Sequence, residues 1–74
     1  MEKELFLKKM KELLNCENIN LDTSLLDIDE WDSFSRVRYM AMVNEELGIV
    51  LPRFDVAEAE SIGDLYNIIL ENQE

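Results

Sequence analysis

The spacing of its apolar residues restricts this chain to helical folds. In residues 3–15, apolar side chains recur every three or four positions, which places them on one face of a helix. They are Phe6, Met10, Leu13 and Leu14. No segment shows the strict alternation of a half-buried strand, and only residues 49–51 form a short apolar run. The sequence therefore predicts an all-α protein.

Two further segments share this periodicity and carry helix-boundary signals. Asp32 can cap a helix over 33–47, and Gly48 can end it in the left-handed conformation that glycine adopts readily. Ser61 followed by Asp64 approximates a capping box for a last helix. For 33–47 we expect an apolar face made of Phe34, Val37, Met40, Ala41, Val43 and Leu47. For the last helix we expect a face made of Ile62, Leu65, Tyr66 and Ile69.

Residues 17–32 lack an apolar period and are rich in Asn, Asp, Ser and Thr, which favour turns. We expect a long loop here, pinned to the helices by its own apolar side chains. These are Ile19, Leu21, Leu25, Leu26, Ile28 and Trp31. A short third helix is predicted over 54–59, after Pro52. The expected architecture is a small four-helix bundle in which residues 1–74 form one domain.

Charge and cysteine content exclude several classes of function. The formal net charge is −10, so nucleic acid would be repelled and basic partners are favoured. Cys16 is the single cysteine, cannot form an internal disulfide, and is expected to be a small buried hydrophobe. No apolar run reaches the length of a membrane span, and the N-terminus lacks the apolar stretch of a signal peptide. We expect a soluble, cytoplasmic monomer with no membrane partner.

Most catalytic and metal sites lack the residues that they need. The chain has no histidine and two glycines, which argues against a histidine base and a glycine-rich phosphate loop. Asp27 and Asp29 suggest a calcium loop, but its sixth position is Asp32 where a glycine is required. We therefore expect no catalytic residue and no metal, and we interpret the stretch as a solvated acidic loop.

Asp32-Ser33-Phe34 stands where the acidic loop meets the second helix. In the first turn of a helix the backbone N–H groups lack internal partners and the dipole favours negative charge. A phosphate ester on Ser33 would therefore be stabilised there. Asp32 and Ser33 could instead be capping residues with no further role, as most Asp-Ser pairs before an amphipathic helix are, and the tripeptide taken alone favours this interpretation. From these residues alone both interpretations stay open.

Four motifs in sequence order resemble those of the acyl and peptidyl carrier protein family. Asp32-Ser33-Phe34, preceded by Glu30-Trp31, is similar to the D-S-L motif that opens the second helix in that family. The others are Asp22-Thr23-Ser24-Leu25, Asn44-Glu45-Glu46-Leu47-Gly48-Ile49 and Ser61-Ile62-Gly63-Asp64-Leu65. The resemblance extends over essentially the whole chain.

This resemblance implies both a fold and a cofactor. The fold would be a four-helix bundle of acyl-carrier type, with a long first loop and a short third helix. Ser33, next to the motif residue Asp32, would carry a 4′-phosphopantetheine arm that a phosphopantetheinyl transferase takes from coenzyme A. The arm would carry acyl or aminoacyl cargo as a thioester between acyl-activating and acyl-transferring enzymes. The chain itself would not be an enzyme.

The second helix departs from the family pattern in its charge. Phe34 replaces the usual leucine, and Arg36 and Arg38 stand where fatty-acid carriers expose acidic residues. With Ala41 and Glu45, these residues are candidates for partner binding. Charge complementarity selects partners, so the arginines favour a specialised pathway, such as polyketide, nonribosomal peptide or modified-acyl synthesis.

Two alternatives remain open at this point. The arginines could be ordinary surface residues near Glu45 and Asp32. The chain could also be an unmodified, small acidic helical protein that docks on a basic partner, for which Ser33→Ala would be harmless. The large side chains of the middle helices are interpreted as core packing in preference to a cargo groove. These side chains are Tyr39, Met40, Met42 and Phe54.

Overall fold

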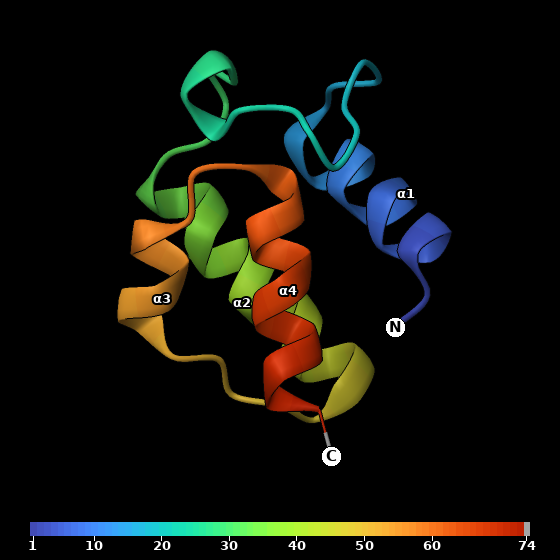
Figure 1. Ribbon diagram of the computed structural model, residues 1–74, viewed down its shortest axis with the longest axis vertical. Coiled ribbons are helices and arrows are strands. Elements are labelled where there is room, and N and C mark those ends of the chain that lie inside the picture. Colours follow the sequence, from blue (N-terminus) through green and yellow to red (C-terminus); the bar gives the residue numbers. More distant parts are fainter. Residues whose placement is uncertain (74) are drawn as a thin grey trace.

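The structure is a computed structural model that describes residues 1–73, and it consists of helices joined by loops (Figure 1). The helices are α1 (Lys3–Leu14), α2 (Ser33–Leu47), α3 (Arg53–Glu58) and α4 (Ile62–Asn72), with a 3-10 helix, η1, at Leu25–Asp27. Over residues 1–73 there is no strand, and the β-type pairing is limited to one isolated bridge between Ser24 and Ser61. The predicted all-α bundle of four helices is therefore confirmed.

The helix boundaries follow the predicted capping residues closely. The Asp32 carboxylate caps α2, and Gly48 ends it with a φ of 68°. Ser61 and Asp64 form a complete capping box at the start of α4, because each side chain accepts a hydrogen bond from the other residue's backbone N–H. α1 ends at Asn15 with a φ of 52°, a conformation that asparagine tolerates better than most residues. The α3 helix begins at Arg53 and ends at Glu58, so each of its ends lies one residue earlier than predicted.

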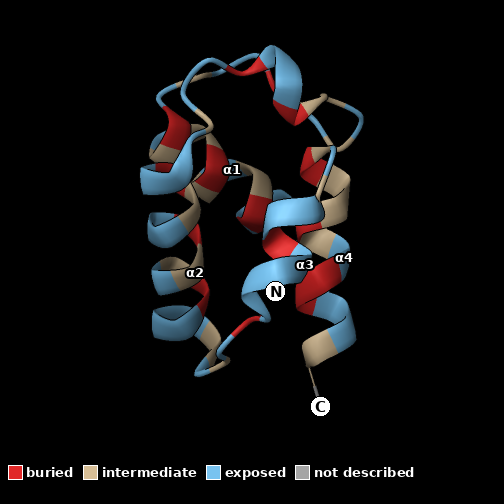
Figure 2. Cartoon of the chain, turned by 90° about the vertical axis from the view of Figure 1, so that its left-hand side faces the viewer, coloured by how far each residue is buried: buried red, intermediate tan, exposed pale blue. Residues whose placement is uncertain are grey.

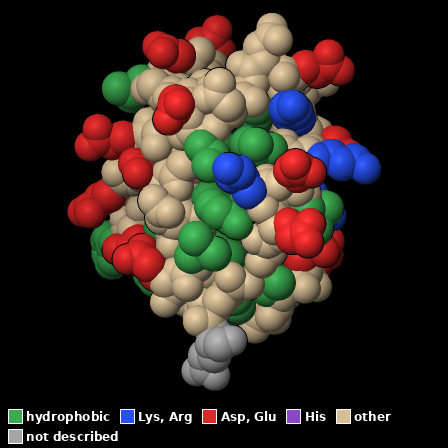
Figure 3. Space-filling view, turned by 45° about the vertical axis from the view of Figure 1, so that its right-hand side comes forward, with side chains coloured by type: hydrophobic (Ala, Val, Ile, Leu, Met, Phe, Trp, Pro, Cys, Tyr) green, Lys and Arg blue, Asp and Glu red, His purple; other side chains and the backbone are tan. Residues whose placement is uncertain are grey.

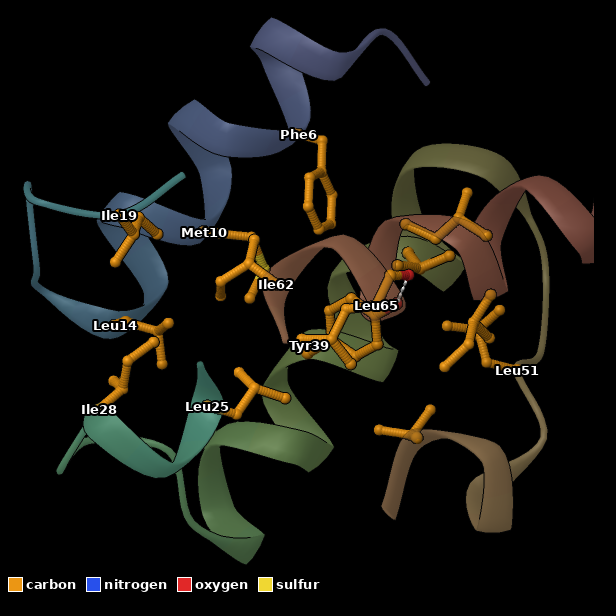
Figure 4. Packing of buried hydrophobic residues seen from close by; sticks show 14 residues of the cluster. Phe6, Met10, Leu14, Ile19, Leu25, Ile28, Tyr39, Leu51, Ile62 and Leu65 are labelled. Carbon is orange, nitrogen blue, oxygen red and sulfur yellow. Dashed lines mark hydrogen bonds between the residues drawn. The ribbon is translucent and has the colours of Figure 1, made fainter. Parts of the chain in front are cut away.

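One apolar cluster joins the four helices and the long loop (Figure 4). Its buried members are Phe6, Met10, Leu14, Ile19, Leu25, Ile28, Tyr39, Val43, Leu51, Val56, Ile62, Leu65, Ile68 and Ile69. Figure 2 shows these buried positions on the inward sides of the helices, with α3 lying in front of the space between α2 and α4. Cys16 is partly buried against this cluster.

The long loop is fixed to the N-terminal end of α4 by backbone hydrogen bonds. These run from Ile62 N to Thr23 O (3.0 Å), from Gly63 N to Leu21 O (2.8 Å) and from Leu25 N to Glu60 O (2.9 Å). The side chains of Ile19, Leu25 and Ile28 are buried, and those of Leu21 and Trp31 are partly buried, so the predicted pinning is confirmed for these five residues. It is wrong for Leu26, which is 90% exposed, because η1 turns successive side chains to different sides.

The buried face of α2 differs from the predicted one. Its buried residues are Ser35, Tyr39 and Val43, and Val43 alone belonged to the predicted set. Met40 and Leu47 are partly buried, while Phe34, Val37 and Ala41 are exposed. Burial of Ser35 and Tyr39 is possible because both hydroxyls donate hydrogen bonds to backbone carbonyls. A search for apolar side chains alone misses this face.

The prediction that Phe54 packs in the core is wrong, since its side chain is 82% exposed and takes no part in the core. The α3 helix has six residues and buries only Val56, so its other side chains face outward. Tyr39 is buried and Met40 and Met42 are partly buried, which confirms core packing for Tyr39 and in part for the two methionines.

Charged side chains are unevenly distributed over the surface. Figure 3 shows hydrophobic side chains near the centre of one face, Lys and Arg side chains both among them and at the upper right, and acidic side chains mostly around them toward the margins. Within residues 1–73 the single ion pair joins Lys9 Nζ on α1 to Glu46 Oε1 on α2 at 2.8 Å. The hydrogen bond to Glu46 raises the pKa of Lys9.

Candidate functional site

The first turn of α2 is organised by the carboxylate of Asp32. Its Oδ1 accepts a hydrogen bond from Ser35 N at 2.9 Å, and its backbone carbonyl accepts one from Arg36 N at 3.0 Å. The bond from Ser35 N is the main cause that lowers the pKa of Asp32 below its ordinary value. The predicted capping role of Asp32 is therefore confirmed, and this residue holds a negative charge beside Ser33.

The loop that enters α2 is also fixed from within the helix. The hydroxyl of Ser35 donates a hydrogen bond to the backbone carbonyl of Glu30, and Trp31 N donates one to Ile28 O at 3.1 Å. The Trp31 ring packs edge-on against Tyr39, with ring centroids 6.2 Å apart. Together these contacts define the position at which the chain enters the helix.

Ser33 differs from Ser35 in every respect that affects reactivity. Ser35 is buried and its hydroxyl is engaged, whereas Ser33 is exposed. Within residues 1–73 no hydrogen bond is formed by the Ser33 side chain. The site thus presents one accessible primary hydroxyl at the start of a helix, on a backbone that its neighbours hold in place.

A groove of about 710 Å³ lies beside this hydroxyl, between α2 and α3. The α2 side chains along it begin with Ser33 and end with Asn44. Most of the remaining lining is apolar, and the charged residues that line it are both arginines, Arg36 and Arg53. The lining also includes Val37, Met40, Ala41, Val50, Leu51, Phe54, Val56 and Ala57.

The five residues predicted to bind partners are distributed over two sides of α2. Phe34, Arg38, Ala41 and Glu45 are spaced at helical intervals of four, three and four, so they follow one exposed stripe. Phe34 is 73% exposed. Arg36 is half-buried and lines the α2–α3 groove with Ser33. Ala41 lies at the border, since it also lines this groove.

The two arginines of α2 therefore face different neighbours. Arg38 lines a hollow with α1 residues, which include Lys9, Glu12 and Leu13. Among residues 1–73, neither arginine lies within 4.0 Å of a carboxylate, so neither forms an ion pair with Glu45 or Asp32. Nothing within the described part of the chain neutralises their charge at close range.

Sequence reasoning considered a groove and set it aside, since Met40 and Phe54 were interpreted as core residues and both line this groove. Its second wall combines the loop residue Val50 with Arg53 and Phe54 at the start of α3, and Val50 and Phe54 are strongly exposed. The sequence held one usable signal, because the apolar run 49–51 precedes Pro52 and lacks helical periodicity. Such a run can cover a neighbouring helix, but its position depends on tertiary packing.

Comparison with known protein families decides which class of site this is. The sequence model of the family described as phosphopantetheine attachment site matches residues 4–69. The chain belongs to this family. It is an acyl or peptidyl carrier protein, and its family carries covalently attached 4′-phosphopantetheine. No match was found among curated proteins or among solved structures.

The residues at the start of α2 fit this cofactor. A phosphopantetheine arm is joined to its carrier through a hydroxyl, and Ser33 offers an exposed hydroxyl within the matched residues, next to an open groove. Carriers of this family are generally not catalysts themselves, and they generally interact with a phosphopantetheinyl transferase and with acyl-handling enzymes. This carrier is therefore expected to depend on other proteins for its chemistry.

Across residues 1–73, no three Asp, Glu, Cys or His side chains gather in a way that could hold a metal ion. None of the described helices combines the length and the apolar composition needed to cross a membrane.

Proposed function

We propose that Ser33 bears the 4′-phosphopantetheine arm and that the chain carries acyl or aminoacyl groups between partner enzymes without catalysing a reaction itself. The observation that carries this proposal is the contrast between the two serines of the first turn of α2. Ser35 is buried and hydrogen-bonded, while Ser33 is exposed and its hydroxyl has no protein partner within residues 1–73. When bound, the arm supplies a terminal thiol on which cargo is held as a thioester.

The attachment reaction requires only an accessible hydroxyl from this chain. The Ser33 Oγ forms a bond to the phosphorus that bears the pantetheine group, the pyrophosphate P–O bond of coenzyme A breaks, and the adenosine bisphosphate half leaves. The hydroxyl proton passes to a base. The chain contains no histidine, so we assign this base, and the magnesium that assists the leaving group, to the transferase. The role of Ser33 is to present its hydroxyl, and the role of Asp32 is to hold the turn that presents it.

We further propose that Phe34, Arg36, Arg38, Ala41 and Glu45 contact partner enzymes. All except the half-buried Arg36 are exposed, and Phe34 offers a large apolar side chain directly beside Ser33. The first three turns of α2 contain arginines and no acidic residue. Because charge complementarity governs association rates and suppresses wrong partners, these arginines support a dedicated set of partners and a specialised biosynthetic pathway.

The proposed site is tested by intact-protein mass spectrometry. The wild type, Ser33→Ala and the matched control Ser24→Ala are each incubated with coenzyme A, magnesium and a broad-specificity phosphopantetheinyl transferase. We expect the wild type and Ser24→Ala to gain the mass of one phosphopantetheinyl group and Ser33→Ala to gain none. Circular dichroism spectra of all three proteins verify that they are folded.

Two results would contradict the proposal. Loading of Ser33→Ala would place the arm on another residue. A folded wild type that several transferases fail to load would instead favour an unmodified acidic protein that docks on a basic partner.

A further inference from the structure

Ser33 and Arg36 lie on the same side of α2 and line the same groove. They are three residues apart, and side chains at this spacing are neighbours on a helix, with Cβ atoms about 5–6 Å apart. Arg36 is half-buried, which restricts its side chain to the vicinity of the groove. A guanidinium group is thus positioned within one helical turn of the hydroxyl.

Once an arm is attached, this end of α2 carries two negative charges, and the guanidinium of Arg36 can bind one of them. A phosphodiester on Ser33 places a negative charge next to the carboxylate of Asp32, which is ionised at neutral pH and whose pKa the hydrogen bond from Ser35 N lowers further. Two neighbouring anions repel each other. Arg36 has no carboxylate partner within ion-pair distance in residues 1–73, and guanidinium groups bind phosphate oxygens through paired hydrogen bonds.

We propose that Arg36 binds the phosphodiester of the arm and thereby directs the arm into the α2–α3 groove. This inference rests on the proposed attachment at Ser33. It assigns different roles to the two arginines of α2, since Arg38 lines a separate hollow against α1. Arg36 is a positioning residue for the arm in addition to its place in the proposed partner surface, and Arg38 serves the partner surface alone.

The shape of the groove matches an occupant that is tethered at one end. Its α2 wall runs from Ser33 to Asn44, which corresponds to about 16 Å along a helix that rises 1.5 Å per residue. Beyond Arg36 the walls are mainly apolar, with Val37 and Met40 on α2 and Phe54 on α3, and the other cation of the lining, Arg53, belongs to α3 and not to the turn that bears Ser33. A chain that starts at Ser33 therefore meets a cation first and an apolar channel after it, which suits an anionic link followed by an uncharged arm.

Phosphorus NMR of the loaded protein tests this assignment, because the arm contributes the only phosphorus atom. Mass spectrometry first establishes loading of the wild type, Arg36→Gln, Arg36→Lys and Arg38→Gln. In the wild type we expect a phosphorus chemical shift that differs from that of free phosphopantetheine. Arg36→Gln should lose most of this difference, Arg36→Lys should retain part of it, and Arg38→Gln should retain all of it.

A second measurement uses only the wild type, so it does not depend on whether a variant folds or is loaded. We expect loading to shift the side-chain Nε–H signal of Arg36 and to leave that of Arg38 in place. Nuclear Overhauser contacts from the arm to Val37 and Phe54 are expected as well. Equal phosphorus shifts in the wild type and Arg36→Gln, or an unmoved Arg36 signal in the loaded wild type, would overturn the inference while leaving the attachment site intact. Absence of loading at Ser33 would overturn both.

Discussion

The hydroxyl of Tyr39 on α2 donates a 2.6 Å hydrogen bond to the backbone carbonyl of Leu65 on α4 (Figure 4). Both residues are fully buried, and they are separated by 26 positions in the sequence. Apolar contacts have little directional preference, whereas a buried hydrogen bond requires one relative placement of donor and acceptor. This bond therefore fixes how α2, and with it Ser33, is placed against the last helix.

Replacing Tyr39 with Phe should lower the free energy of unfolding by about 1–1.5 kcal/mol, because the bond is lost while the ring is kept. Urea denaturation should show a lower midpoint with an unchanged slope. Tyr66→Phe is the matched control. Its hydroxyl donates to the Met1 carbonyl at the chain terminus, so we expect a smaller loss. Equal stability of Tyr39→Phe and the wild type would contradict the structural role of this bond.

The buried phenol of Tyr39 should also make the free energy of unfolding decrease at alkaline pH. Burial raises the pKa of Tyr39 above its ordinary value of 10.0, so the unfolded chain releases this proton at a lower pH than the native protein does. The stabilising contribution is present below the unfolded-state pKa and is lost as the pH rises above it. The difference in unfolding free energy between the wild type and Tyr39→Phe should therefore shrink from neutral pH to about pH 11. A constant difference would argue against burial of the phenol.

Asp32 should have the opposite pH dependence. Its folded-state pKa is lowered below the ordinary value of 3.8, chiefly by the hydrogen bond from Ser35 N. The stabilising contribution is therefore present above that ordinary value and is lost as the pH falls through the folded-state pKa. Asp32→Ala should be less stable than the wild type at neutral pH, and the two should converge in acid. Urea denaturation at several pH values measures this, and a gap that persists in acid would show that the charge is not involved.

Gly63→Ala should destabilise the protein although alanine favours helices. A Cβ atom at this position would lie 2.8 Å from the backbone oxygen of Leu21, so the long loop would have to move away from α4. Crowding of this kind costs about 1–3 kcal/mol. Asn67→Ala, at an exposed position of the same helix, should change stability by no more than about 0.5 kcal/mol. Similar melting temperatures for the two variants would mean that the loop adapts without cost.

The two sides of α3 should respond differently to substitution. Phe54 is 82% exposed, so Phe54→Ser should alter the unfolding free energy by less than about 0.5 kcal/mol. Val56 is buried, and Val56→Ala should cost about 2 kcal/mol through lost burial and the cavity left behind. Thermal denaturation of the pair measures the contrast. A large loss for Phe54→Ser would show that its ring supports the fold.

The sequence was most informative where structure depends on neighbouring residues. Asp32, Gly48 and the pair of Ser61 and Asp64 set helix boundaries through contacts within a few positions, and all of them act as predicted. The Asp32-Ser33-Phe34 motif alone left capping and attachment open, and the candidate hydroxyl was identified by the resemblance of four motifs along the chain to a known family.

Prediction failed where the outcome depends on contacts between distant segments. Val37 was assigned to the buried face of α2 and is exposed, whereas Tyr39, which was correctly interpreted as a core residue, is buried with its hydroxyl bonded to a carbonyl of α4. No local pattern reveals this contact. The α2–α3 groove has the same origin, since its second wall is brought to α2 by a short helix and the loop before it. Phe54 was wrongly assigned to the core for the same reason. The sequence alone does not show that α3 is too short to bury side chains on two of its sides.

The attachment of the long loop to residues 60–63 has a consequence for how the protein is made. Residues 21–25 of the loop that leads to Ser33 are bonded to residues 60–63 at the beginning of α4, which is synthesised after them. A nascent chain that still lacks α4 has the serine and the local bonds of its turn, but not the bonds that hold the preceding loop against α4. A modifying enzyme that contacts both the turn and this loop would therefore act on the complete fold in preference to incomplete chains.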